Sequence, residues 1–132
     1  MSLTGARVLI VDDDEGVRDL FERSFAREGF TVRGASDGEQ ALRLMSEEQP
    51  QLIVLDLMMP RVNGIEVLAA MRQQAGLVAV PVLVTTGTAT TAFELRDFGP
   101  LRVMRKPFEL ARLVRIGREM LGGTEAEPQT SG

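Results

Sequence analysis

The chain has 132 residues, a net charge of −4, and neither cysteine nor histidine. Its length fits one domain, and 44% of apolar residues is too high for a disordered chain. The negative charge argues against direct nucleic-acid binding by a basic surface. The missing residue types exclude disulfides, thiolate metal sites and any site that needs an imidazole.

The sequence contains no sign of a membrane segment. No apolar run is long enough to cross a bilayer, and the first residues lack the charged and then apolar pattern of a signal peptide. The absence of cysteine fits a reducing compartment. We therefore expect a cytoplasmic protein with no membrane partner.

The first part of the chain alternates between strand and helix patterns. Residues 7–12 and 30–35 are short apolar runs of the kind that form buried parallel strands. Apolar residues at helical spacing follow in 15–29, where Gly29 is placed to end a helix. Residues 36–39 have the spacing of a capping box, which predicts the start of a second helix at this point.

The same alternation continues through the second part of the chain. Residues 52–56 and 80–87 predict a third and a fourth strand, and 64–74 predicts a helix between them. Residues 88–98 predict a weaker fourth helix, because threonine is a poor helix former. A fifth strand is expected at 101–105 and a last helix at 107–121.

Five strands that alternate with five helices predict an α/β fold. Right-handed crossovers place helices on both faces of one parallel sheet, which gives a single doubly wound (βα)5 sandwich. We expect this domain to cover residues 5–122. Residues 123–132 are polar and rich in glycine and proline, so we expect a flexible tail or the start of a linker.

Ligands of open α/β sheets bind at the carboxyl ends of the strands, and chemically active side chains stand at four of these ends. The fifth strand is followed by Lys106, the only lysine beside fourteen arginines. An ammonium is a compact charge that suits a narrow site better than a planar guanidinium does. The other strand ends carry Asp12, Asp13 and Asp14, then Asp56, then Thr85 and Thr86.

Asp12, Asp13 and Asp56 should converge from neighbouring strands. Two carboxylates about 4 Å apart repel by roughly 4 kcal/mol at an effective dielectric constant of 20. A proton or a divalent cation must therefore join them, and oxygen ligands at a site open to water suit Mg²⁺. For Asp14 and Glu15 we favour a simpler role at the start of the first helix.

Four motifs together resemble response-regulator receiver domains, from Val8 to about Leu121. They are VLIVDDDE, LIVLDLMMPRVNG, PVLVTTG and KPF, in this order and at suitable separations. The resemblance implies a flavodoxin-like strand order of 2-1-3-4-5. It also implies a role in two-component phosphorelay signalling.

The resemblance assigns a role to each matching residue. It implies that Asp56 accepts a phosphoryl group from a phosphohistidine on a sensor histidine kinase or a phosphotransfer protein. Asp13 would bind Mg²⁺ directly, Asp12 would help partly through water, and the backbone carbonyl of Met58 would be a further ligand. Of the remaining residues at the site, Thr86 would hydrogen-bond the phosphoryl group and Lys106 would pair with it.

Further expectations come from the same resemblance. The domain would not be an enzyme beyond Mg²⁺-dependent self-phosphorylation and slow autodephosphorylation, for which Met58 and Thr88 occupy the two rate-setting positions. The Lys106–Pro107 peptide bond would be cis. A homodimer could form through the fourth helix, fifth strand and fifth helix, and a longer parent could carry a C-terminal output domain.

The sequence also departs from the family pattern. Val103 stands where an aromatic switch residue is usual, and 88–99 is shorter than is common. A degenerate receiver that acts only as an interaction module is therefore one alternative. A small phosphatase with an aspartate nucleophile is another, although Met58 stands where its second aspartate belongs. A flavodoxin-like cofactor binder is a third, although DDDEG after the first strand would repel phosphate.

Overall fold

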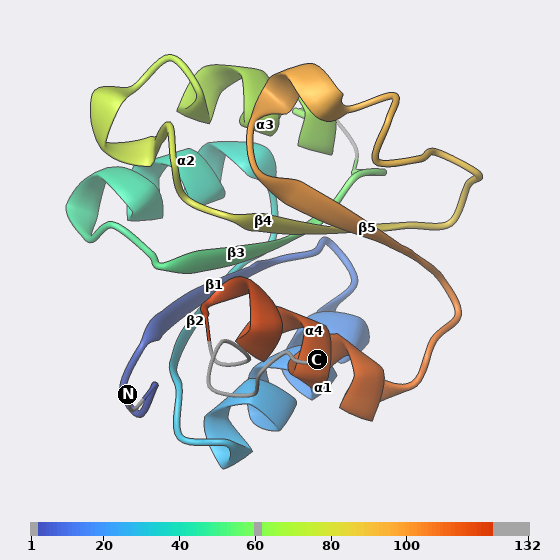
Figure 1. The fold of residues 1–132 in the computed structure, drawn as a ribbon. Coiled ribbons are helices and arrows are strands. Elements are labelled where there is room, and N and C mark those ends of the chain that lie inside the picture. The colour runs from blue at the N-terminus through green and yellow to red at the C-terminus, as the bar shows by residue number, and fades with distance from the viewer. Residues whose placement is uncertain (1–2, 60–61, 123–132) are drawn as a thin grey trace.

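The computed structural model describes residues 3–59 and 62–122 of the chain. Figure 1 shows a parallel sheet with α2 and α3 on one face and α1 and α4 on the other. The strand order is β2-β1-β3-β4-β5, which confirms the predicted fold class. The strands are β1 Arg7–Val11, β2 Thr31–Ala35, β3 Leu52–Asp56, β4 Val82–Thr86 and β5 Leu101–Arg105, and the α-helices are α1 Glu15–Arg27, α2 Gly38–Glu47, α3 Gly64–Met71 and α4 Leu110–Met120.

The continuous apolar runs in the strands supply two separate cores. Successive side chains of a strand point to opposite faces, so a strand covered on both sides must be apolar throughout. In β3, Ile53 and Leu55 pack toward α2 and α3, whereas Leu52 and Val54 pack toward α1 and α4. All five residues of β3 are buried, which places the carboxylate at its end on a rigid support.

The helix starts follow local side-chain chemistry. Asp14 caps α1 by accepting the backbone N–H of Val17, as the simpler role for this residue predicts. The expected cap of α2 is one residue too early, because Asp37 accepts the N–H of Gln40 while Ser36 lies before the cap. A reciprocal capping box is present instead at α3, between Asn63 and Glu66.

The predicted fourth helix is wrong. Residues 88–99, all of which the structure describes, contain only the short 3₁₀ helix η2 (Arg96–Phe98). Thr91 and Glu94 cap each other's backbone N–H groups as at a helix start, but a turn rather than an α-helix follows. Gly99 and Pro100 then end the segment before a helix of useful length can form. Of the three elements expected to form a dimer face, only β5 and α4 are therefore present.

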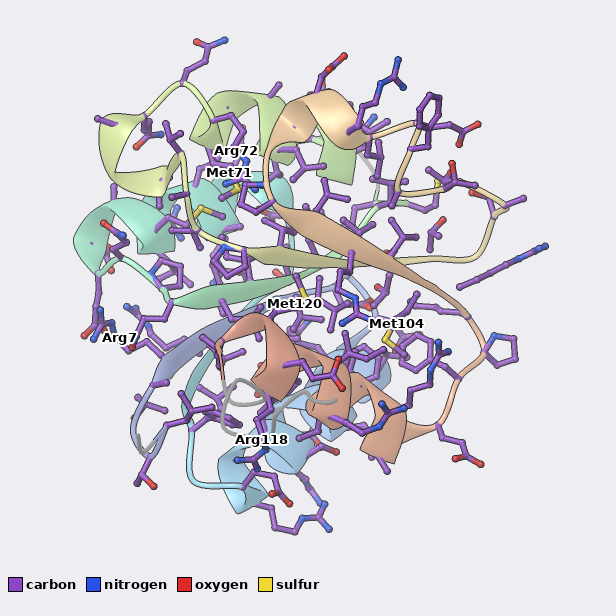
Figure 2. All side chains as sticks on the ribbon, viewed as in Figure 1. Arg7, Met71, Arg72, Met104, Arg118 and Met120 are labelled. Carbon is purple, nitrogen blue, oxygen red and sulfur yellow. The ribbon has the colours of Figure 1, made fainter. Side chains whose placement is uncertain are left out.

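Helix α3 ends at Met71, earlier than predicted. The side chain of the next residue, Arg72, forms hydrogen bonds with the backbone of the segments that follow. Its half-buried guanidinium donates to five backbone carbonyls, two of which lie on the far side of β4 in sequence. Figure 2 shows Arg72 beside Met71, on the α2–α3 side of the sheet. The acceptors are Leu77 (2.8 Å), Val78 (3.1 Å), Val80 (2.8 Å), Pro100 (3.0 Å) and Phe98.

This guanidinium requires a glycine beside it. Gly99 has φ +85°, and a Cβ atom there would lie 2.5 Å from the Arg72 Nε. The peptide that carries the Phe98 carbonyl can therefore reach Arg72 only because residue 99 has no side chain. The 3₁₀ helix η1 (Ala75–Leu77) and the loop before β5 are thus held to α3 by one side chain.

On the opposite face, the first and last helices pack against each other. The rings of Phe21 on α1 and Phe108, just before α4, stack with centroids 5.8 Å apart. Arg118, labelled on α4 in Figure 2, pairs with Glu28 after α1, and the two atoms are 2.7 Å apart. None of the helices in 3–59 and 62–122 is both long and apolar enough to span a membrane. The expected tail at 123–132, together with Pro60 in the β3–α3 loop, falls outside the described residues.

Candidate functional site

The carboxyl ends of β1, β3 and β5 bring the predicted acids and lysine together. Asp12 follows β1 directly and Asp56 is the last residue of β3. One carboxylate oxygen from each of Asp12, Asp13 and Asp56 lies within 4.8 Å of the others. The predicted convergence of these three aspartates is therefore present.

The three aspartates differ in how much water reaches them. Asp12 and Asp56 are only 1% and 5% exposed, whereas Asp13 is exposed. The cluster thus combines two buried acids with one acid that is exposed to solvent.

Lys106 closes one side of the cluster. Its Nζ lies 3.2 Å from Asp12 Oδ2 and 3.9 Å from Asp56 Oδ2. Its backbone N–H donates to the Thr86 carbonyl at 2.7 Å, and the Lys106–Pro107 peptide bond is cis, as expected from the resemblance. The single lysine of the chain is therefore directed at the two buried acids.

Backbone groups fix the orientation of both buried carboxylates. The Met58 N–H donates to Asp56 Oδ1 at 3.1 Å, and the Asp14 N–H donates to Asp12 Oδ1 at 2.9 Å. In each residue the other oxygen, Oδ2, is the one nearest Lys106. Each acid thus has one oxygen held by the protein and one directed at the ammonium.

Burial raises the pKa of Asp56 from 3.8 to about 6. The Met58 N–H opposes this rise, the charge of Asp12 adds to it, Lys106 opposes it and Asp13 adds to it. The single ammonium therefore does not offset the burial of Asp56 among other acids. A further positive charge at this place would favour the ionised form of Asp56.

The donor set fits Mg²⁺. The three acids offer carboxylate oxygens and the fourth candidate offers a carbonyl oxygen, which are ligands that this hard cation prefers, and Asp13 is exposed to water. The Met58 carbonyl is the fourth predicted ligand. The backbone N–H of the same residue is the group that donates to Asp56 Oδ1.

Thr86 ends β4 and is fully buried. Its hydroxyl accepts the Thr88 N–H at 3.1 Å and lies 3.0 Å from the Thr88 hydroxyl. The Thr88 hydroxyl lies in turn 2.8 Å from that of Thr90. Sequence reasoning singled out Thr86 and Thr88 but missed Thr90, because the expected helix would have separated these side chains.

Two further residues shape the site. A Cβ atom on Gly64 would lie 2.6 Å from Leu57 Cα and 2.7 Å from the Asp56 carbonyl, so α3 can start against the end of β3 only with glycine there. Sequence reasoning missed Arg18, whose guanidinium donates to the Asp12 carbonyl at 2.9 Å, because a cation on an amphipathic helix carries no separate signal.

The chain matches known proteins over most of its length. The family model described as response regulator receiver domain matches residues 8–117. Response regulator MprA of Mycobacterium ulcerans is 36% identical over 121 residues, which are 92% of this chain and 52% of that protein. Response regulator MprA of Mycolicibacterium vanbaalenii is 36% identical over 118 residues, 89% of this chain and 51% of that protein.

Solved structures give the same result. Chemotaxis protein CheY4 of Vibrio cholerae superposes with a TM-score of 0.83 at 27% identity, over 89% of this chain and 99% of that one. NtrX of Brucella abortus, solved in complex with ATP, has a TM-score of 0.81 at 28% identity, over 93% of this chain and 28% of that one. The chain spans about half the length of the curated relatives it matches.

Proposed function

Because the chain belongs to the family of response-regulator receiver domains, we propose that Asp56 accepts a phosphoryl group from a phosphohistidine of a sensor histidine kinase or phosphotransfer protein. The observation that carries the proposal is the orientation of Asp56. One of its oxygens is fixed by the Met58 N–H, and the other faces Lys106 beside two more acids.

In the proposed reaction an oxygen of Asp56 attacks the phosphorus atom. A P–O bond forms, the P–N bond to the donor imidazole breaks, and the imidazole leaves with the electron pair. The nucleophile must be ionised, so it has no proton to lose and no general base is needed. This explains how a chain without histidine can take part, since the only imidazole required belongs to the donor.

Charge neutralisation is the main task of the surrounding residues. Asp12, Asp13, Asp56 and the Met58 carbonyl would hold Mg²⁺, which when bound offsets negative charge on the phosphoryl oxygens. Lys106 is close enough to Asp56 to pair with an oxygen of the transferred group. Thr86 would donate its hydroxyl to another of these oxygens.

We further propose that the acyl phosphate is hydrolysed at an intermediate to slow rate. The two residues at the rate-setting positions, Met58 and Thr88, are both exposed. A thioether and a hydroxyl are weak groups for activating water, in contrast to a carboxylate or an amide. The domain would then act as a timed switch rather than as an enzyme with multiple turnover.

The partners proposed are those of a signalling module. The curated relatives are about twice as long as the matched region, which supports an output domain in a longer parent. A homodimer remains a proposal for β5 and α4, without the fourth helix that would complete the usual face. Val103 is only partly buried beside Val84, and it cannot provide a ring at the switch position.

The test is intact-mass spectrometry of the chain after incubation with acetyl phosphate and Mg²⁺. We expect a gain of one phosphoryl group in the wild-type chain, none in Asp56→Asn, and a normal gain in the control Asp97→Asn, which changes an exposed aspartate on η2. An unmodified wild-type chain would favour the degenerate receiver. Turnover of added phosphate esters by the chain would favour the phosphatase instead.

A further inference from the structure

Three threonine hydroxyls form a continuous chain from the site to the surface. The hydroxyl chain consists of Thr86, Thr88 and Thr90, with Oγ1–Oγ1 separations of 3.0 Å and 2.8 Å. Within residues 3–59 and 62–122, both hydrogen-bond partners of the Thr86 hydroxyl are on Thr88. The hydroxyl of Thr86 is thus already engaged on the side of the loop that follows β4.

The stoichiometry of a hydroxyl limits what Thr86 can do in this state. It has one hydrogen and two lone pairs, and one lone pair accepts the Thr88 N–H. If the Thr86 hydrogen goes to Thr88, the Thr88 hydroxyl is free to donate onward to Thr90, and each link polarises the next. With the hydrogens in this direction, Thr86 must give up this arrangement before it can donate its hydrogen to a phosphoryl oxygen on Asp56.

The far end of the hydroxyl chain meets a groove beside the acceptor loop. Thr90 is partly buried and lines this groove together with Met58, Asn63 and Ile65. Met58 and Ile65 are 59% and 42% exposed, so the groove presents apolar surface to solvent. A change at Thr86 therefore has a hydrogen-bonded route to the surface.

The hydroxyl chain is important because the backbone around it forms no regular helix. Residues 88–99 lack the regular helix that would hold this loop by backbone hydrogen bonds. The side-chain bonds of Thr88 and Thr90 take over part of this task. At the neighbouring strand, Val103 offers no ring that could follow a movement of Thr86.

We propose that Thr88 and Thr90 are positioning residues that hold the Thr86 hydroxyl in an orientation unable to reach Asp56. Phosphorylation would draw the Thr86 hydroxyl away, break the hydroxyl chain and release the Thr90 wall of the groove. This inference rests on the proposed phosphorylation of Asp56. It gives Thr90 an influence on the phosphorylation of Asp56, although Thr90 contacts neither the acids nor the lysine of the site.

The test measures initial rates of phosphorylation by acetyl phosphate and Mg²⁺, followed by intact-mass spectrometry, on single variants of the whole chain. Thr90→Val removes the last hydroxyl while keeping the shape of the side chain. We expect it to raise the rate about fivefold, the factor that one ordinary hydrogen bond is worth. Thr90→Ser restores the hydroxyl and should return the rate to that of the wild type.

Two controls separate this role from loosening of the loop. Thr91→Val removes the neighbouring threonine hydroxyl, which accepts the Glu94 N–H outside the hydroxyl chain, and should leave the rate unchanged. Thr88→Val breaks the chain at its centre. The double variant Thr88→Val, Thr90→Val should then be no faster than Thr88→Val alone, because a broken chain cannot be broken again.

Each result decides between distinct conclusions. Equal rates in the wild type, Thr90→Val and Thr88→Val would overturn this inference alone and leave the proposed function intact. A rise in Thr91→Val as large as that in Thr90→Val would also overturn it, in favour of general loop mobility. Failure of the wild-type chain to gain a phosphoryl group would overturn the proposed function and this inference together.

Discussion

Asp56 is a carboxylate whose burial works against its own ionisation. The pKa of Asp56 rises from 3.8 to about 6, mainly through burial. The folded state therefore keeps a proton that the unfolded chain has already lost between these two values. By proton linkage, folding stability falls as pH rises through this window, and the full penalty is present above it.

Asp56→Asn should accordingly stabilise the fold in a pH-dependent manner. A shift from 3.8 to about 6 corresponds to at most about 3 kcal/mol. In buffer with a chelator, we expect the gain in unfolding free energy to be small near about pH 4 and nearly complete above about pH 7. Urea unfolding followed by circular dichroism at several pH values measures it.

The matched control for this measurement is Asp97→Asn, which changes an exposed aspartate. Its effect on unfolding free energy should stay small and flat across the same pH range. A constant difference between Asp56→Asn and the wild type at all pH values would contradict the account, since it would point to packing rather than to titration.

At the scale of elements, the hydrogen bonds of Arg72 hold backbone segments that a fourth helix would otherwise have ordered. Five carbonyls from η1, the loop after it, η2 and the loop before β5 share one guanidinium. Burial lowers the pKa of Arg72, but its charge-assisted bonds offset the lost hydration. No side chain with fewer N–H donors than arginine can bond all five acceptors at once.

Arg72→Met should therefore destabilise the fold by about 3 kcal/mol or more, because several carbonyls lose their partner. Arg72→Lys should restore only part of this loss. Arg43→Met, which changes an exposed arginine on α2, should alter the unfolding free energy little. Thermal unfolding of the three variants tests this, and equal stability of Arg72→Met and Arg43→Met would refute it.

The elements also mark where prediction from sequence reached its limit. The continuous apolar runs in β1 and β3 identified both strands, because strands buried on both faces are apolar throughout. The segment 88–98 misled because the pairing of Thr91 with Glu94 resembles a helix start. The role of Arg72 had no signal, since its acceptors are backbone atoms of loops up to 28 positions away.

At the scale of the whole molecule, the site joins elements that no single segment contains. Asp12, Asp56 and Lys106 come from β1, β3 and the end of β5, and the parallel order of the sheet brings them to one edge. Sequence reasoning reached these residues because strand ends in such sheets meet by topology. It could not foresee Thr90 or Arg18, because their contacts depend on loop and side-chain geometry.

Binding of Mg²⁺ should stabilise the whole fold, since the folded chain presents the site and the unfolded chain does not. Above the dissociation constant, we expect the unfolding free energy to rise by about 1.4 kcal/mol for each tenfold increase in Mg²⁺. Asp13→Asn should largely lose this response. Thermal or urea unfolding at several Mg²⁺ concentrations measures it.

Asp14→Asn is the control for this response. Asparagine caps a helix about as well as aspartate, so α1 should remain intact and the Mg²⁺ response should persist. If Asp13→Asn and Asp14→Asn responded equally, the stabilisation would reflect general screening of negative charge rather than a site.

The contact between Lys106 and Asp12 joins residues 94 positions apart. During synthesis, a chain emerging from the ribosome exposes its three aspartates long before its only lysine is made. Until the edge strand β5 has been added, the two buried acids face each other without their ammonium. A nascent chain therefore lacks the cation of this site, and under the proposed phosphorylation of Asp56 its competence to receive a phosphoryl group would begin only when translation has passed the last strand.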